Sequence, residues 1–305
     1  MSASETPNPS RRHLLTAGAG AIGLAAGTYA GAALAHRPAS IVVDGRRRFD
    51  GQVIAITGAT SGIGRAAALR FAREGGKVAF CGRREHLGAE LEAEIRQEGG
   101  EATYIRADVR NEADVQTFIE KTVSRYGRLD VAFNNAGITV QKPLHEYSID
   151  DFDDIQNTNV RGVFLAMKYQ IPEMLKAGGG VIVVTSSAVV MKSGKERSLY
   201  AASKRAVLGL VQGAAIDYAG SNIRINALLP GTTDTDFVRR LAGFEDAPDA
   251  AWAAAGALWA RNALPVAGRL ATADEMADLA LMLASKEHPY LNGTQLLADG
   301  AQSSA

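Results

Sequence analysis

The sequence predicts an α/β protein built on one doubly wound, mostly parallel sheet. From residue 50 onward, short apolar runs rich in β-branched residues alternate with longer segments of helical pattern. A glycine-rich turn joins the first apolar run to a clear helix at residues 65–73. We expect seven strands, at residues 52–57, 77–82, 102–109, 129–133, 181–185, 224–229 and 294–298.

The composition sets limits on function. The 305 residues include 33 basic and 33 acidic side chains, so the net charge gives no sign of a nucleic-acid partner. Cys81 is the single cysteine, which excludes an internal disulfide and a cysteine-based zinc site. The five histidines are scattered without the spacing of metal ligands, so we predict no metal.

The first 35 residues have the features of a signal peptide. The pair Arg11 and Arg12 precedes a mildly apolar run at residues 16–35, which closes on an Ala-Leu-Ala sequence. Paired arginines are typical of a twin-arginine signal, so we expect export to the periplasm, with no stable membrane insertion after cleavage. The alternatives are an uncleaved membrane anchor and a cytoplasmic protein. Residues 36–49 are predicted to form a linker in which the run Arg46 to Arg48 is a solvated cluster, and residues 50–305 the folded domain.

The turn after the first strand is the first candidate site. Gly58, Gly62 and Gly64 lie between a buried strand and a helix, in a G-x-x-x-G-x-G spacing. Free N–H groups at a helix N-terminus and its positive dipole end bind phosphate. An ordinary turn is the alternative, but three glycines in this setting favour an anion site.

The end of the second strand carries Gly82, Arg83 and Arg84. In a dinucleotide-binding fold, an acidic residue here binds the ribose 2′-hydroxyl of NAD, whereas an arginine accommodates the 2′-phosphate of NADP. We therefore predict NADP, with NAD as the alternative if both arginines are only surface charges.

Further along the chain, Asp108 ends the third strand, where it is expected to accept a hydrogen bond from adenine, to cap the next helix near Glu112, or both. Asn135, Ala136 and Gly137 follow the fourth strand. Such small and amide residues permit close approach to a ribose.

The helix predicted at residues 149–176 contains Asn159 and Gly162, which are unfavourable in a helix interior and indicate a kink or a hydrogen-bonding role. Ser187 follows the fifth strand, at the edge where open α/β sheets place their sites. Tyr200 and Lys204 lie four residues apart on one helix face. We expect the ammonium to lower the pKa of the phenol and prepare it for proton transfer, although such pairs are more often merely solvated.

Residues 232–262 contain aromatic side chains among many alanines, directly after the sixth strand and Pro230-Gly231. We predict a helical lid that closes over an apolar group.

From about residue 50 to 301 the chain resembles the short-chain dehydrogenase/reductase family. The resemblance rests on Thr57 to Gly64, Asn134 to Gly137, Asn159, Ser187, Tyr200-Ala-Ala-Ser-Lys204, Pro230-Gly231 and Asp299-Gly300, in that order. It implies a Rossmann fold, a small-molecule alcohol or carbonyl substrate, and a homotetramer or homodimer built on the helices that carry Asn159 and Tyr200.

The resemblance also implies roles for individual residues. Tyr200 would be the general acid/base, Ser187 would hold the substrate oxygen, and Lys204 would bind the nicotinamide ribose. Asn159 would keep a kinked helix and a water chain. The cofactor would lie against the remaining residues, namely Gly58, Ser61, Gly62, Ile63, Gly64, Asp108, Val109, Asn135, Ala136, Gly137, Pro230, Gly231, Thr233 and Thr235.

The sequence therefore predicts an NAD(P)-dependent oxidoreductase that interconverts an alcohol and a ketone or aldehyde. The alternative is a protein that binds the cofactor as a sensor or scaffold without turnover. The substrate and the direction of the reaction stay open.

Overall fold

The computed structural model describes residues 45, 47–264 and 268–304, so the predicted signal peptide and most of the linker lie outside the described residues. Its main sheet has seven parallel strands in the order β3-β2-β1-β4-β5-β6-β9. The strands are β1 Val53–Thr57, β2 Lys77–Gly82, β3 Glu101–Arg106, β4 Val131–Asn134, β5 Gly180–Thr185, β6 Ile223–Pro230 and β9 Gln295–Ala298. The predicted doubly wound parallel sheet is confirmed.

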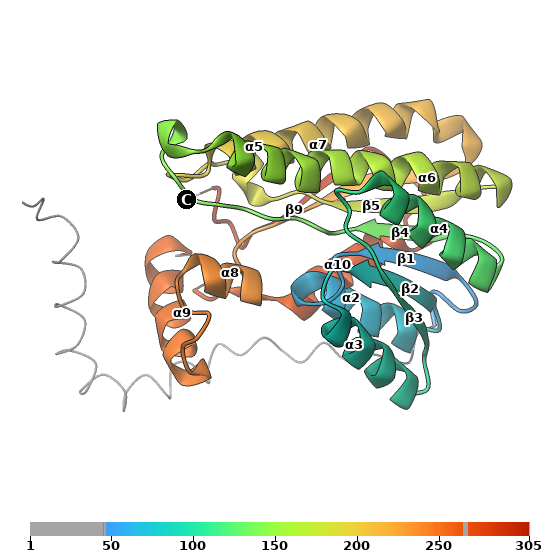
Figure 1. Cartoon of the computed structure of the whole chain (residues 1–305), viewed down its shortest axis with the longest axis horizontal. Coiled ribbons are helices and arrows are strands. Elements are labelled where there is room, and N and C mark those ends of the chain that lie inside the picture. The colour runs from blue at the N-terminus through green and yellow to red at the C-terminus, as the bar shows by residue number, and fades with distance from the viewer. Residues whose placement is uncertain (1–44, 46, 265–267, 305) are drawn as a thin grey trace, which may run out of the picture. The chain divides into compact units, whose positions relative to one another are not determined.

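Helices cover both faces of the sheet (Figure 1). One face packs against α2 Gly62–Arg73, α3 Glu85–Gln97 and α10 Ala273–Ala284, and the other against α4 Glu112–Tyr126, α6 Gly162–Lys176 and α7 Ser198–Asp217. Side chains alternate along each strand. In β2, Val78 and Phe80 join the first face, whereas Ala79 and Cys81 join the second. Burial on both faces explains why the strands are continuous apolar runs.

The folded domain begins before the predicted linker ends. Phe49 is fully buried and meets Phe71 of α2, with ring centroids 4.7 Å apart. Arg48 makes a two-point ion pair with the buried Glu74, at 2.6 and 2.5 Å. The prediction of a solvated run is therefore wrong for Arg48, whose carboxylate partner is supplied by a residue 26 positions later in the chain.

The helix predicted at residues 149–176 is interrupted. It divides into α5 Ile149–Gln156, a π-helical turn Asn157–Arg161, and α6. The expected irregularity at Asn159 is confirmed. Such π-bulges are rare and are found mostly at functional sites.

The third strand is shorter than predicted and ends at Arg106, two residues before Asp108. The cap of α4 is Asn111, whose side chain accepts hydrogen bonds from the backbone N–H groups of Ala113 and Asp114. The expectation that Asp108 caps this helix is wrong, because Asn111 stands directly before Glu112 and takes that position.

The insertion after β6 is helical, as predicted. It contains the short strand β7 Thr233–Asp234, α8 Asp236–Leu241 and α9 Asp249–Ala263, and β7 pairs with β8 Ala271–Thr272. Three short 3₁₀-helical turns are also described, at Leu144–Glu146, Ala188–Val190 and Ala219–Ser221. Among the described residues, no helix combines the length and the apolar character needed to cross a bilayer.

Candidate active site

A cavity of about 730 Å³ lies at the carboxyl ends of the parallel strands. The sheet order places β1 and β4 side by side, so the chain leaves β1 toward β2 on one side and later returns to β4 on the other. This reversal of strand order creates a crevice in an open α/β sheet. All of the predicted site residues line the cavity except Gly64 and Asn159.

The glycine turn is shaped by close packing of backbone. Gly58 has a φ of +68°, and a Cβ there would lie 2.6 Å from the Cα of Ala136. A Cβ on Gly64 would lie 2.4 Å from the carbonyl oxygen of Gly58. Gly64 therefore does not reach the cavity but lets α2 pack closely against the turn. The result is a cradle of backbone with the N-terminus of α2 at the cavity wall, as the anion-site interpretation requires.

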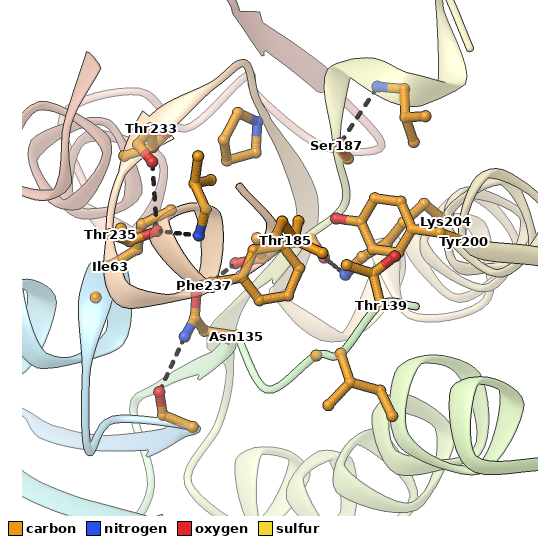
Figure 2. Close-up of a pocket in the computed structure, with 18 of the residues that line it drawn as sticks. Ile63, Asn135, Thr139, Thr185, Ser187, Tyr200, Lys204, Thr233, Thr235 and Phe237 are labelled. Atoms are coloured by element: carbon orange, nitrogen blue, oxygen red, sulfur yellow. Dashed lines mark hydrogen bonds between the residues drawn. The ribbon is translucent and has the colours of Figure 1, made fainter. Parts of the chain in front are cut away.

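Asn135 joins the ends of three strands. Its side-chain amide donates to the carbonyl oxygen of Gly58 at 3.1 Å and accepts from the hydroxyl of Thr185 at 3.2 Å (Figure 2). Its backbone N–H donates to the hydroxyl of Thr57 at 3.2 Å. These bonds fix the turns after β1, β4 and β5 relative to one another.

The end of β2 is cationic. Arg83 and Arg84 are exposed at the cavity wall, and Arg84 donates to the hydroxyls of Thr60 at 3.0 Å and Ser61 at 2.7 Å. The nearest acidic residue in sequence, Glu85, is paired with Arg106 at 3.1 Å. The wall therefore offers two guanidinium groups beside two hydroxyls.

Asp108 also lies at this end of the cavity, but its carboxylate is engaged. Arg110 forms an ion pair with it at 2.7 Å. Burial alone would raise the pKa of Asp108, but the hydrogen bonds from Arg110 outweigh burial and hold the pKa below its usual value.

Tyr200, Ser187 and Lys204 face the cavity together (Figure 2). The Ser187 hydroxyl is a hydrogen-bond partner of the Tyr200 phenol. The ammonium of Lys204 lies 5.8 Å from the centroid of the Tyr200 ring and donates to the carbonyl oxygen of Thr185 at 2.8 Å. Lys204 is only 3% exposed, and this burial lowers its pKa to about 8.

The expected pKa shift of Tyr200 is wrong in direction. Burial raises the pKa of the phenol, and the Ser187 hydrogen bond and the charge of Arg197 oppose this rise only in part. The Lys204 ammonium does not offset the cost of burying a phenolate, because the groups that lower the pKa of this phenol are Ser187 and Arg197.

Asn159 supports this arrangement from below the cavity. It is fully buried and exchanges hydrogen bonds with the backbone of Ile138 at 2.8 and 2.9 Å. Its amide also donates to the hydroxyl of Ser203, the residue next to Lys204, at 3.0 Å. The π-helical turn thus connects the loop after β4 to the helix that carries Tyr200 and Lys204.

Pro230, Gly231, Thr233 and Thr235 also line the cavity, and the chain continues from them into α8. The Thr235 hydroxyl caps α8 by accepting from Val238 at 3.4 Å, so a local role accompanies its place at the cavity. Phe237 of α8 lies against Tyr200, with ring centroids 6.3 Å apart. His145 stands apart at 84% side-chain exposure, and no group of potential metal ligands forms among the described residues.

Several cavity residues escaped the sequence analysis, among them Thr60, Thr185, Arg197 and Gln302. Thr185 carried a usable signal, because it ends a strand at the same sheet edge as Ser187. Gln302 carried none. It accepts from the backbone and hydroxyl of Thr232 at 3.2 and 3.1 Å, a contact between residues 70 positions apart.

The lowered pKa of Lys204 predicts a pH-dependent stability. At pH values between the lowered pKa of about 8 and the ordinary pKa of 10.5, the folded protein binds fewer protons at Lys204 than the unfolded chain does. The free energy of unfolding therefore rises with pH in this window, and below it the fold bears the full cost of the buried ammonium. Relative to Lys204→Met, the wild type is expected to gain about 2 kcal/mol between about pH 7.5 and about pH 10, measured by denaturant unfolding.

Lys176→Met is the matched control, because Lys176 is 71% exposed on α6. Wild type and this control should change in parallel over the same window. A parallel change for Lys204→Met as well would contradict the lowered pKa.

Comparison with known proteins agrees with this geometry. Residues 52–245 match the family of short chain dehydrogenases. The A-factor type gamma-butyrolactone 1'-reductase (1S-forming) of Streptomyces virginiae is 41% identical over 254 residues, which cover 82% of this chain and 94% of that protein. The 3beta-hydroxysteroid dehydrogenase of Mediterraneibacter gnavus is 35% identical over 264 residues, with 83% and 95% covered.

Among solved structures, levodione reductase has a TM-score of 0.77 at 34% identity, and the match covers 84% of this chain and 99% of that one. The family match extends over more than half of the sequence, and the cavity brings together the residues on which the resemblance rests. The chain therefore belongs to the short-chain dehydrogenase family of oxidoreductases.

Proposed function

We propose that this protein interconverts an alcohol and a ketone or aldehyde, with Tyr200 as general acid/base and NADP as the preferred cofactor. The observation that carries the proposal is the cavity itself, which joins the glycine turn and the two arginines of β2 to the group Ser187, Tyr200 and Lys204. Relatives named as reductases and dehydrogenases support the reaction class.

The described residues fit a nicotinamide dinucleotide. Members of the family use NAD or NADP, which supplies or accepts the hydride when bound. The glycine turn leaves no room for a Cβ at Gly58 or Gly64, as expected where backbone must come close to its neighbours and leave the helix N-terminus open for phosphate. Asn135, Ala136 and Gly137 continue this wall toward Tyr200.

The raised pKa of Tyr200 suits a proton donor. Its phenol stays protonated at neutral pH and can deliver the proton to a carbonyl oxygen during reduction. Ser187, already a hydrogen-bond partner of that phenol, would hold the same oxygen. Because charge develops on the oxygen only during reaction, two fixed hydroxyls stabilise the transition state more than the ground state. In the direction of oxidation, burial works against the phenolate that must accept the proton.

Tyr200→Phe tests the proton-transfer role. The substitution removes the phenolic hydroxyl and keeps the ring against Phe237, so kcat should fall by about a hundredfold or more. NADPH affinity, measured by fluorescence titration, should change little. Tyr218→Phe at the end of the same helix is the control and should retain activity.

Near-normal turnover by Tyr200→Phe would overturn the assignment. A wild-type protein that binds NADPH but turns over nothing across a broad panel of alcohols and ketones would favour the sensor or scaffold interpretation instead.

The proposed preference for NADP is supported by the residues at the end of β2. Two exposed guanidiniums line the cavity there, and the neighbouring Glu85 is paired with Arg106, so this carboxylate does not compete with a 2′-phosphate for the two arginines. Arginine binds phosphate with several N–H groups at once, and hydrogen bonds to charged groups contribute about 1.5 to 3 kcal/mol.

Replacing Arg83 and Arg84 together by alanine should therefore lower kcat/KM for NADPH by about ten- to a hundredfold. The value for NADH should change much less, because it has no 2′-phosphate. Arg125→Ala, on α4 and away from the cavity wall, controls for loss of positive charge. Equal losses with both cofactors, or a wild type that prefers NADH, would contradict the NADP proposal.

We also propose that the protein is exported and that it forms an oligomer. Residues 1–35 support export to the periplasm, and exposed apolar side chains on α5 to α7 support a homodimer or homotetramer through these helices, among them Ile149, Phe152, Phe164 and Ile216. Mass spectrometry of the protein purified from its own cells tests both, because denaturing conditions give the cleavage state and native conditions give the number of subunits. An intact Met1 terminus in a cytoplasmic monomer would contradict both.

A further inference from the structure

The cavity contains positive charge that the proposed hydride transfer does not use. Among the described side chains that line it, Asp108 is the single acidic one, and Arg110 already pairs with it. Apart from Arg83, Arg84 and Lys204, the basic side chains are Lys192, Arg197 and Arg240. They come from the loop after β5, from the residue before α7, and from α8.

Lys192 and Arg197, which follow β5, lie away from the proposed 2′-phosphate site. In the sheet, β2 and β5 are separated by β1 and β4. Three strand spacings of about 4.8 Å put roughly 14 Å between the two loops. Arg197 therefore does not share a ligand group with Arg83 and Arg84, and it stands instead one helical turn before Tyr200.

Arg197 is held in place by a neutral partner. Its Nε and Nη2 atoms face the Gln141 side chain, and the amide orientation that presents an oxygen to them gives distances of 3.1 and 3.2 Å. Its side chain also passes close to Gly194, where an added Cβ would lie 3.6 Å from the Cδ atom. The guanidinium is half-buried with its charge uncompensated by Gln141, and three of its five N–H donors are left for other acceptors.

The backbone before Arg197 is strained to achieve this placement. Glu196 has a φ of +60°, which is uncommon for a residue with a side chain. Its carbonyl oxygen accepts hydrogen bonds from the backbone N–H of Lys142 at 3.2 Å and from the Tyr147 hydroxyl at 2.8 Å. Glu196 is exposed and does not line the cavity, whereas Arg197 does. Such strain persists where surrounding contacts enforce it, most often at functional sites.

From this geometry we infer that the substrate is an organic acid, whose oxyanion group is bound by Arg197 while its carbonyl or hydroxyl group meets Ser187 and Tyr200. The inference rests on the proposed function, which it deepens. Arg240 also lines the cavity and adds to its positive charge. Val189, whose backbone N–H donates to the Ser187 hydroxyl, and Phe237, which lies against Tyr200, provide an apolar surface for the rest of the molecule.

Binding of a matched pair of unreactive ligands tests the inference without turnover. Calorimetry on the full chain first measures NADPH alone, so that a failure of cofactor binding is seen separately and counts against the proposed function. The enzyme–NADPH complex is then titrated with octanoate and with octanamide, which share an alkyl chain but differ in charge. Octanoate should bind about ten- to a hundredfold more tightly.

Arg197→Gln should abolish this preference, mainly by weakening octanoate, and should leave octanamide and NADPH affinities nearly unchanged. Lys195→Gln is the matched control, because Lys195 lies in the same loop, is exposed and does not line the cavity. It should keep the preference. Octyl phosphate in a third titration distinguishes a carboxylate site from a phosphate site, according to which anion binds more tightly.

Equal affinity for octanoate and octanamide, no measurable binding of either, or an unchanged preference in Arg197→Gln would overturn the inference. A merely structural role for Arg197 predicts that all three ligands and NADPH weaken together in Arg197→Gln. That outcome would also overturn it.

Discussion

The burial of one ammonium group governs the rest of the site. Lys204 is almost completely inaccessible to solvent, and its hydrogen bond runs to the carbonyl oxygen at the end of β5. A buried charge is tolerated only where its donors find acceptors. The fold provides that acceptor by ending β5 next to α7, and the Ser186 hydroxyl ties the two together by donating to the backbone of Lys204 at 3.0 Å. The π-helical turn then fixes the neighbouring Ser203 through Asn159. Any change that moves α7 away from β5 would leave this charge without a partner.

Much of the fold could be predicted from the sequence, because its signals are local. Each strand is a short apolar run, and each helix follows at the spacing of a βα unit, so the seven-stranded sheet needed no long-range information. The glycine turn could be recognised for the same reason, since Gly58 and Gly64 are required by the backbone immediately around them. Even the irregularity of the long helix was visible, because Asn159 and Gly162 are unfavourable inside a regular helix.

Features that depend on distant partners could not be predicted. Arg48 looked like part of a solvated cluster because its carboxylate, Glu74, lies at the far end of α2. The pKa of Tyr200 depends on burial, and Phe237, which lies against its ring, comes from a helix 37 residues later in the sequence. Spacing alone showed that Lys204 is near Tyr200, but it could not show that burial of the phenol outweighs the groups that lower its pKa. Arg197 was missed because its direction depends on the left-handed backbone of Glu196.

The internal contacts of residues 232–262 explain how one such distant partner, Phe237, is brought to the site. Trp252 of α9 donates to the Asp234 carboxylate of β7 at 2.6 Å and meets Phe244, with ring centroids 5.8 Å apart. Arg239 donates to the backbone of Phe244 at 2.8 Å and to Asp249 at the start of α9 at 2.8 Å. The segment is therefore a small folded unit with its own hydrogen bonds, and it carries Phe237 to Tyr200 as a fixed group. Phe237 thereby contacts the ring of the residue whose pKa is raised by burial. The order of this segment therefore fixes one of the side chains that contact Tyr200.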